Sequence, residues 1–291
     1  ALVLGLVSVV VAVVSGYFIF RDYVPETNKV AGMMAGIYTG GTMNFNALGA
    51  SLNVDKSVMA IVLAFQMVIT TPYVFFLLGG GYKIFRKLLP YKDVTWRGRT
   101  DEDTIATTDV ENYHNMLEKK NLIGMLKGLG LSVVFLAIGA GLALLITGTL
   151  NELVVILTIT TLSIIASFFK KVRELPKTFE LGMFFILIFS VIVASMFNIH
   201  SVNGGSLYVG GFVFWIIGVS VVLHLILCRI AKVSGDLFCV SQVGLLCSPP
   251  FVPPIAGAMK NKKVIISGIV VGLVGYAVGT YLGAFLAWVL G

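Results

Sequence analysis

Residues 37–46 read Ile-Tyr-Thr-Gly-Gly-Thr-Met-Asn-Phe-Asn and lie in the middle of an apolar run of membrane length at 30–52. A glycine pair interrupts a helix and frees backbone groups, which in lipid must be satisfied by protein or by a wet cavity. A second interrupted run at 237–258 contains Ser-Gln-Val-Gly-Leu-Leu-Cys-Ser-Pro-Pro-Phe-Val-Pro-Pro at 241–254, where four prolines deny helix continuation. Irregular backbone at membrane depth therefore predicts a shielded cavity.

Uninterrupted apolar runs surround these two segments, and each is close to the roughly 20 residues that a spanning helix needs. They occupy residues 1–20, 58–80, 122–147, 153–169, 179–197, 209–228 and 264–290. The 291-residue chain is 57% hydrophobic and only 12% charged, whereas soluble domains carry about a quarter charged residues. We expect an all-α polytopic protein of the inner or plasma membrane, whose main partner is the lipid bilayer.

The basic residues cluster beside the apolar runs, which is typical of cytoplasmic loops and not of a nucleic-acid surface. The loop at 83–120 is strongly basic, and placing it in the cytoplasm puts the basic segments at 170–177 and 229–232 inside as well. Three lysines within 260–263 stay inside only if the Pro-rich segment enters and leaves on the cytoplasmic side. The same reasoning predicts that the Gly-Gly segment is re-entrant from the opposite face.

The order helix, broken segment, helix occurs at 1–80 and again at 209–290, in inverted orientation. Inverted repeats whose broken segments meet near the membrane midplane are typical of secondary transporters. We divide the chain into a first repeat at 1–80, a charged cytoplasmic linker at 81–120 and a second repeat at 121–291. The later unit has three additional spans before it, so by symmetry we expect about three further helices before Ala1.

The polar groups at the two breaks form the candidate binding site, because backbone, amide and hydroxyl groups replace the hydration of a solute or ion. The candidates are Thr39, Gly40, Gly41, Thr42, Asn44, Asn46, Ser241, Gln242, Gly244 and Ser248. The alternative for such small residues is close helix packing. We assign to packing the glycines near one face of the last run, which are Gly268, Gly272, Gly275, Gly279 and Gly283.

Other chemistry is informative mainly by what the sequence lacks. All fourteen carboxylates lie in loops or near predicted helix ends, which disfavours a proton antiporter with an acidic group at the midplane. His224 lies inside a span and could carry a proton, but no carboxylate accompanies it. The three cysteines, Cys228, Cys239 and Cys247, fit small core residues. We expect no enzyme activity, no catalytic residue, no metal site and no cofactor beyond Na⁺ as a coupling ion.

Three stretches resemble the uncharacterised DUF819 (YjcL-like) family of membrane proteins: residues 38–44, the pair Ser241-Gln242 before the Ser/Pro-rich loop, and Gly-Tyr-Ala-Val-Gly-Thr-Tyr-Leu-Gly at 275–283. After Ser-Gln, where family members show Asn and Gly-Gly-Pro, this chain has Val-Gly-Leu-Leu-Cys-Ser-Pro at 243–249. The family is distantly similar to cation/proton antiporters and to bile-acid-type and glutamate sodium symporters. That resemblance implies a transporter core that moves against a scaffold, and a homodimer by analogy.

The sequence therefore predicts a secondary active transporter of a small polar, anionic organic solute, coupled to Na⁺ or H⁺ by alternating access. Two alternatives stay open. One is a cation/proton antiporter of similar architecture, and the other is a non-transporting membrane receptor or scaffold that acts through the charged loop.

Overall fold

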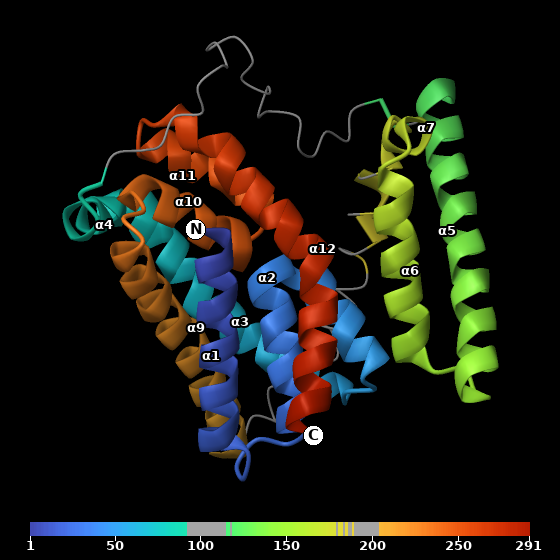
Figure 1. Cartoon of the computed structure of the whole chain (residues 1–291), viewed down its shortest axis with the longest axis horizontal. Helices are drawn as coiled ribbons and strands as arrows, with labels where there is room; N and C mark the ends of the chain where they lie inside the picture. Colours follow the sequence, from blue (N-terminus) through green and yellow to red (C-terminus); the bar gives the residue numbers. More distant parts are fainter. Residues whose placement is uncertain (92–114, 117, 179, 183, 186–187, 189–203) are drawn as a thin grey trace.

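The computed structural model describes residues 1–91, 115–116, 118–178, 180–182, 184–185, 188 and 204–291. These residues form helices and connecting turns, and no strand occurs among them (Figure 1). Five of the helices are long and apolar enough to cross a membrane. The chain is thus an all-α, multi-pass membrane protein, as its composition predicts.

Most predicted spans correspond to single helices. The matching helices are α1 (Leu2–Phe20), α5 (Lys119–Thr147), α6 (Glu152–Ser167), α9 (Gly204–Ile230) and α12 (Ile265–Leu290). Helix α6 has 16 residues, fewer than a full crossing needs, and the short α7 (Lys170–Arg173) follows it. Most of the predicted span at 179–197 lies outside the described residues.

The predicted end of the apolar run at 58–80 coincides with a break in helical geometry at Gly80, after which a further helix begins. Helix α3 (Lys56–Phe76) continues through a π-helical turn at Leu77–Gly81 into α4 (Tyr82–Leu88). Gly80 adopts a φ of +108°, which lets the backbone change course and resume a helix instead of entering a loop. The basic side chains at 83–87 therefore lie on a helix, and the cytoplasmic linker at 81–120 stays a prediction.

The first broken segment folds back on itself as a helical hairpin. Helix α2 (Thr27–Ser51) loses helical geometry at Gly40 and Gly41, and Gly41 has a φ of +63°, in the left-handed region that favours glycine. Gly49 lies in contact with Met33, 16 residues earlier. In an uninterrupted helix that separation would span about 24 Å. The halves 27–39 and 42–51 therefore pack side by side, and we call them the first hairpin.

The two ends of the first hairpin also meet. The backbone amide of Asp55, just after the hairpin, donates to a carboxylate oxygen of Glu26, just before it, at 3.1 Å. Lys29 Nζ donates to the other oxygen of Glu26 at 2.6 Å and to the carbonyl of Asn53 at 3.4 Å. These contacts define the base of the hairpin.

The second broken segment is a hairpin as well. Helix α10 (Gly235–Leu246) ends before Ser248, a single turn of 3-10 helix follows at Pro249–Phe251, and α11 (Val252–Ala258) returns. Helix α10 does not continue through the four prolines, as the sequence predicts. Pro253 and Pro254 occupy the first turn of α11, where a missing amide donor costs nothing.

Arg86 of α4 holds both ends of this second hairpin. Its guanidinium donates to both carboxylate oxygens of Asp236, at 2.6 and 2.8 Å, and to the carbonyl of Met259, at 2.7 Å. Asn261 also donates to Asp236, at 2.7 Å. The segment thus begins and ends at the same end of the molecule, in agreement with the distribution of charge in the sequence.

Helix α12 passes both hairpins and places their tips together. Its glycines lie at the contacts, as their spacing predicts. From its start to its end, the neighbours are Val240 and Val252 at Gly268, Gly244 and Pro249 at Gly272, Thr39 at Gly275, Asn44 at Gly279, and Gly32 and Leu48 at Gly283. The hairpins therefore lie tip to tip along one helix, with their bases toward its opposite ends (Figure 1). The inverted repeat that this arrangement suggests stays a prediction.

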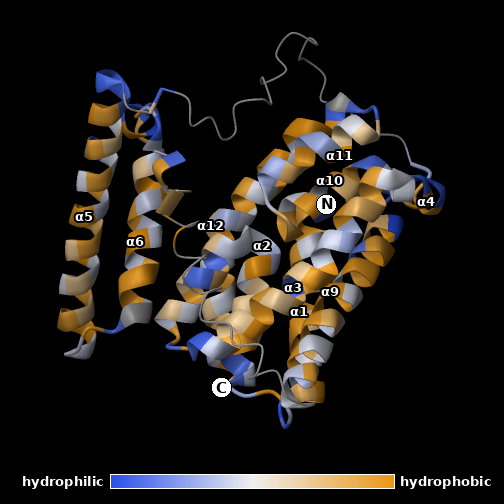
Figure 2. Ribbon diagram, turned by 180° about the vertical axis from the view of Figure 1, so that it is seen from behind, coloured by the Kyte–Doolittle hydropathy of each residue, from blue (hydrophilic) through white to orange (hydrophobic). Residues whose placement is uncertain are grey.

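The remaining helices form two groups. Helices α1 and α9 pack lengthwise against each other, joined by a hydrogen bond of 3.1 Å from Trp215 to Ser15, and α3 packs on α9. Helices α5 and α6 pair at one side of the molecule, and Figure 2 shows that many of their residues are hydrophobic. Leu145 and Ile146 of α5 are 83% and 70% exposed. In a multi-pass membrane protein such apolar surface contacts lipid.

Candidate functional site

The tips of the two hairpins touch each other. A Cβ atom added to Gly41 would collide with the hydroxyl of Ser248, so the first tip needs glycine both for its φ and for the close approach. Ser248 has a φ of +94° and a ψ of +156°, a conformation that is rare outside glycine. Both hairpins thus reverse direction at the point where they meet.

Asn44 ties the first tip to α12. Its Nδ2 donates to the carbonyl of Tyr276 at 3.2 Å, and its Oδ1 accepts from the hydroxyl of Thr280 at 3.2 Å. A side chain at Gly40 or Gly279 would occupy the space of the Asn44 amide. The glycines around this amide therefore let it fit between α2 and α12.

The tip region is not completely covered by protein. Among the ten predicted site residues Thr42 and Ser248 are partly exposed, and the other eight are buried. Tyr276 is also partly exposed, and its ring lies 3.9 Å from the position that a Cβ of Gly41 would take. Ser248 and Tyr276 thus both lie beside Gly41, and Thr42 follows Gly41 in the sequence. We call these three partly exposed residues the tip patch.

Four of the predicted residues do not reach this patch with their side chains. The hydroxyl of Thr39 donates to the carbonyl of Ala35 at 2.8 Å, and that of Ser241 donates to Phe238 at 2.9 Å, each within its own helix. Gly244 packs on Gly268 of α12. Asn46 is buried two positions after Asn44, and residues so spaced face different sides of a helix. Their roles as ligands stay predictions.

Gln242 lies in a separate, fully buried polar chain. Its Oε1 faces Nδ1 of His224 on α9, and its Nε2 donates to the hydroxyl of Tyr38, which comes just before the first break. Ser220 of α9 lies beside the same hydroxyl. This polar chain connects α9, the second hairpin and the first hairpin, within about two helical turns of the tips.

Tyr38, Tyr276 and Thr280 are not among the site residues that the sequence predicts. Tyr38 was visible as a polar group directly before Thr39, and the other two lie between the glycines of α12. The glycines indicate packing, and their spacing carries no information about the polar residues among them. The structure shows that the packing face and the polar face of α12 coincide at the tips.

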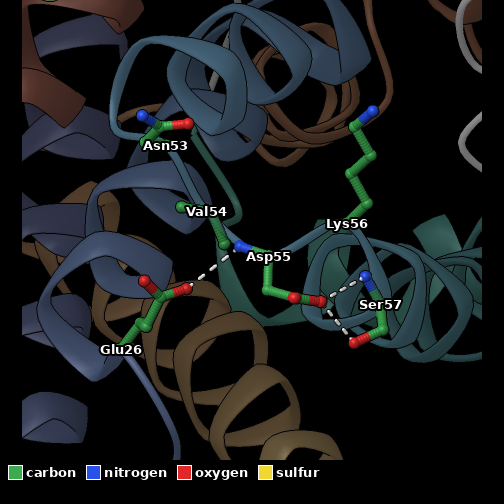
Figure 3. A pocket seen from close by; sticks show the side chains of 6 residues that line it. All are labelled: Glu26, Asn53, Val54, Asp55, Lys56 and Ser57. Carbon is green, nitrogen blue, oxygen red and sulfur yellow. Dashed lines mark hydrogen bonds between the residues drawn. The ribbon is translucent and has the colours of Figure 1, made fainter.

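An open cavity of about 720 Å³ lies at the base of the first hairpin (Figure 3). It is lined by Glu26, Asn53, Val54, Asp55, Lys56 and Ser57. Hydrogen bonds among Glu26, Asp55 and Ser57 use its carboxylates to close the hairpin base and to cap α3. We therefore assign these residues to structure.

No metal centre is evident in the described part of the chain, where no three His, Cys, Asp or Glu side chains cluster closely enough to hold an ion. The three cysteines are free, and Cys228 and Cys239 are buried. The tip region instead offers neutral amide, hydroxyl and backbone groups. Such groups bind a polar solute, or an alkali-metal ion through oxygen atoms.

Comparison with known proteins agrees with this membrane architecture. The family model described as "Protein of unknown function (DUF819)" matches residues 1–291. The uncharacterized membrane protein YjcL of Bacillus subtilis (strain 168) is 22% identical over 301 residues, which cover 96% of this chain and 72% of that protein. No solved structure matches the chain. The chain belongs to the DUF819 family of membrane proteins.

Proposed function

We propose that this protein is a secondary active transporter, and not an enzyme, that moves a small polar, anionic organic solute across the inner or plasma membrane by alternating access, with Na⁺ or H⁺ as coupling ion. The solute lies between the two hairpin tips, where it contacts Thr42, Asn44 and Ser248. The function of this family member thus depends on a site shared by two segments that enter from opposite ends.

One observation carries the proposal: the tips of two hairpins with broken backbone meet beside polar groups of α12. Such breaks expose backbone groups at membrane depth, which is tolerated where they are buried in protein or line a cavity. In secondary transporters, broken helices of this kind form the substrate site. A purely structural role would be served by unbroken helices, which satisfy their own backbone.

The preference for an anion follows from helix direction. The second half of the first hairpin, residues 42–51, begins at the tip, so its unpaired backbone N–H groups and the positive end of its dipole point there. The described residues include no lysine or arginine at the tips. The half 27–39 and α10 end at the tips and present carbonyl groups there, so a carboxylate is favoured only against the N–H groups that begin residues 42–51.

Thermal stabilisation of the detergent-purified protein tests the proposal. The panel contains organic acids, amino acids and small peptides, each with Na⁺ or K⁺ and at two pH values. A solute present at 100 times its dissociation constant is expected to stabilise the protein by about 2.7 kcal/mol.

The variant Asn44→Leu is expected to abolish the stabilisation, whereas Asn28→Ala is expected to keep it. Asn28 is the matched control, because it also donates from the first hairpin to α12, to the Ala287 carbonyl at 3.3 Å, but at the base. If no solute of the panel stabilises the protein, the receptor or scaffold alternative is favoured. A response to Na⁺ or pH alone would favour the antiporter.

A further inference from the structure

His224 is buried where α1, α9 and α10 meet, and both of its ring nitrogens face oxygen atoms. Nδ1 lies at hydrogen-bond distance from Gln242 Oε1, and Nε2 lies 3.2 Å from the carbonyl oxygen of Ala1. The ring of Phe238 packs against the imidazole, with 5.0 Å between centroids. The histidine is therefore held on both nitrogens and on one face.

This arrangement matches a doubly protonated ring. A neutral imidazole has one donor and one acceptor nitrogen, whereas the imidazolium ion has two donors. With two oxygen neighbours, only the imidazolium satisfies both contacts. Gln242 then donates from Nε2 to the hydroxyl of Tyr38, whose own proton points away from Gln242.

The neutral ring fits the same positions when every hydrogen bond reverses. Turning the Gln242 amide by 180° exchanges its nitrogen and oxygen, which have nearly the same shape. Tyr38 then donates to Gln242 Oε1, Gln242 Nε2 donates to His224 Nδ1, and His224 Nε2 donates to Ala1. His224 and Gln242 keep the same hydrogen-bonding neighbours in both states, and the heavy atoms need not move.

We infer that His224 is a proton-binding site whose charge is transmitted by Gln242 to Tyr38, and that the proton is the coupling ion of the transporter. The coupling part of this inference rests on the proposed function. Gln242 belongs to the second hairpin, and Tyr38 lies two residues before the Gly40 break in the first. One protonation event therefore reaches both hairpins close to their tips.

The surroundings single out His224 as the group that titrates. The titratable groups around it are Tyr38 of α2, Tyr73 of α3, Cys228 of α9 and Cys239 of α10. In the described residues His224 forms no ion pair, and the Arg86–Asp236 pair lies at the hairpin base, within electrostatic range of Cys239. Of the side chains in this set, histidine is the one that normally changes charge near neutral pH.

The first test is NMR of ¹⁵N-histidine-labelled protein in lipid nanodiscs between pH 5 and 9. The sequence contains only three histidines, so the variant His114→Gln/His200→Gln leaves His224 as the single signal. We expect the ring to change from one protonated nitrogen to two as the pH falls. The resonance of the Tyr38 ring carbon that bears the hydroxyl, assigned with Tyr38→Phe, is expected to shift with the same midpoint.

Two further variants test whether Gln242 transmits the charge of His224 to Tyr38. Gln242→Leu is expected to leave His224 titrating while Tyr38 no longer follows. Ser241→Ala is the matched control, because the Ser241 hydroxyl bonds only within its own helix, and both signals should titrate as before. A His224 ring that keeps one protonation state from pH 5 to 9 would overturn the inference, as would a Tyr38 signal that stays constant while His224 titrates.

A second measurement separates this inference from the proposed function. For a solute that stabilises the protein, the apparent dissociation constant is expected to rise by up to tenfold per pH unit above the His224 midpoint. The variant His224→Asn should remove that dependence. A stabilising solute whose binding ignores pH would leave the transporter standing and overturn proton coupling. A titrating network without any stabilising solute would support the proton site and overturn the transporter.

Discussion

At the scale of single residues, Asp236 is the carboxylate with the largest structural role. Its side chain is 10% exposed and accepts hydrogen bonds from Arg86 and Asn261 at the base of the second hairpin. Arg86 is 41% exposed, so solvent screens part of the charge attraction. The geometry still matters, because a bidentate arginine pair fixes both direction and distance.

The substitution Asp236→Asn is expected to lower the free energy of unfolding by about 1–3 kcal/mol, the range for hydrogen bonds to charged groups reduced by screening. Thermal unfolding in detergent measures it. The control is Glu174→Gln, which removes an ion pair to Lys170 whose side chains are 60% and 77% exposed. Equal losses in the two variants would show that the hairpin base gains nothing from this pair.

Asp55 gives a prediction for pH. The hydroxyl and amide of Ser57 donate to its carboxylate, the amide at 2.7 Å, and these bonds lower the pKa of Asp55 below its ordinary value (Figure 3). Because the folded-state pKa is lowered, the stabilisation is fully present above the ordinary pKa. It is lost as the pH falls through the folded-state value.

We therefore expect Asp55→Ala to cost about 1 kcal/mol at pH 7, typical for loss of an N-cap, and less below about pH 4. Asp55→Asn keeps a capping oxygen and should cost little at either pH. Urea unfolding curves at both pH values measure the difference. A cost for Asp55→Ala that is the same at pH 7 and pH 3 would contradict the role of the ionised carboxylate.

At the scale of elements, the tip of the second hairpin stores backbone strain. Ser248 adopts a conformation that costs on the order of 1–3 kcal/mol for residues other than glycine. The strain persists because Pro249 follows and the first tip packs against the hydroxyl. Strain held at a meeting point of two segments is expected where the segments must separate and rejoin.

Replacement of Ser248 separates backbone strain from hydroxyl chemistry. Ser248→Gly and Ser248→Ala both lose the hydroxyl, but only glycine relaxes the φ, so the glycine variant should be more stable than the alanine variant by about 1 kcal/mol or more. The same pair at Ser241 is the control, since within helix α10 alanine should be the more stable. Thermal unfolding measures all four variants, and the same order at both positions would exclude strain at Ser248.

The contact of α12 with the first tip depends on Gly275. A methyl group there would collide with the backbone carbonyl of Thr39, which cannot rotate away. We expect Gly275→Ala to lower the stability by about 1–3 kcal/mol, as overpacking does. Gly218→Ala on α9 is the matched control. No atom lies within 4 Å of its added methyl group, so helix propensity should leave the stability unchanged or raise it. If both variants unfold alike, the close approach at the tip is not needed for stability.

At the scale of the molecule, the sequence predicts the kind of fold better than its connections. Apolar length identifies α1, α5, α9 and α12, and the paired Gly40 and Gly41 locate the first break. The continuation of α3 into α4 could not be predicted, because Gly79–Gly81 reads equally as a helix end or as a π turn. The polar chain from His224 to Tyr38 joins residues 186 positions apart, and no local pattern predicts such a pairing.

The binding residues divide in the same way. Asn44 is conspicuous in sequence because an amide in an apolar run needs partners, and the structure supplies Tyr276 and Thr280. Gln242 is conspicuous for the same reason, yet its partners make a buried chain and not part of the tip patch. A polar side chain in an apolar run needs hydrogen-bond partners, and the sequence shows this need. The packing of distant helices decides which groups are the partners.

The opposite entry of the two hairpins is testable in intact membranes. Lys56 is exposed at the base of the first hairpin, and Lys260 is exposed at the base of the second. With an impermeant maleimide on sealed cells, Lys56→Cys is expected to react from outside, and Lys260→Cys only after permeabilisation. Wild type gives the background, since Cys228 and Cys239 are buried and Cys247 is partly buried.

Reaction of both cysteines from one side would mean that the hairpins do not enter from opposite faces. The tips could then still touch, but their meeting point would not separate two aqueous compartments, and alternating access at Gly41 and Ser248 would be impossible. Reaction from opposite sides would mean that the contact between the tips separates the two aqueous compartments. The polar groups beside it would then lie where a transported solute has to pass, because each hairpin covers them from one side only.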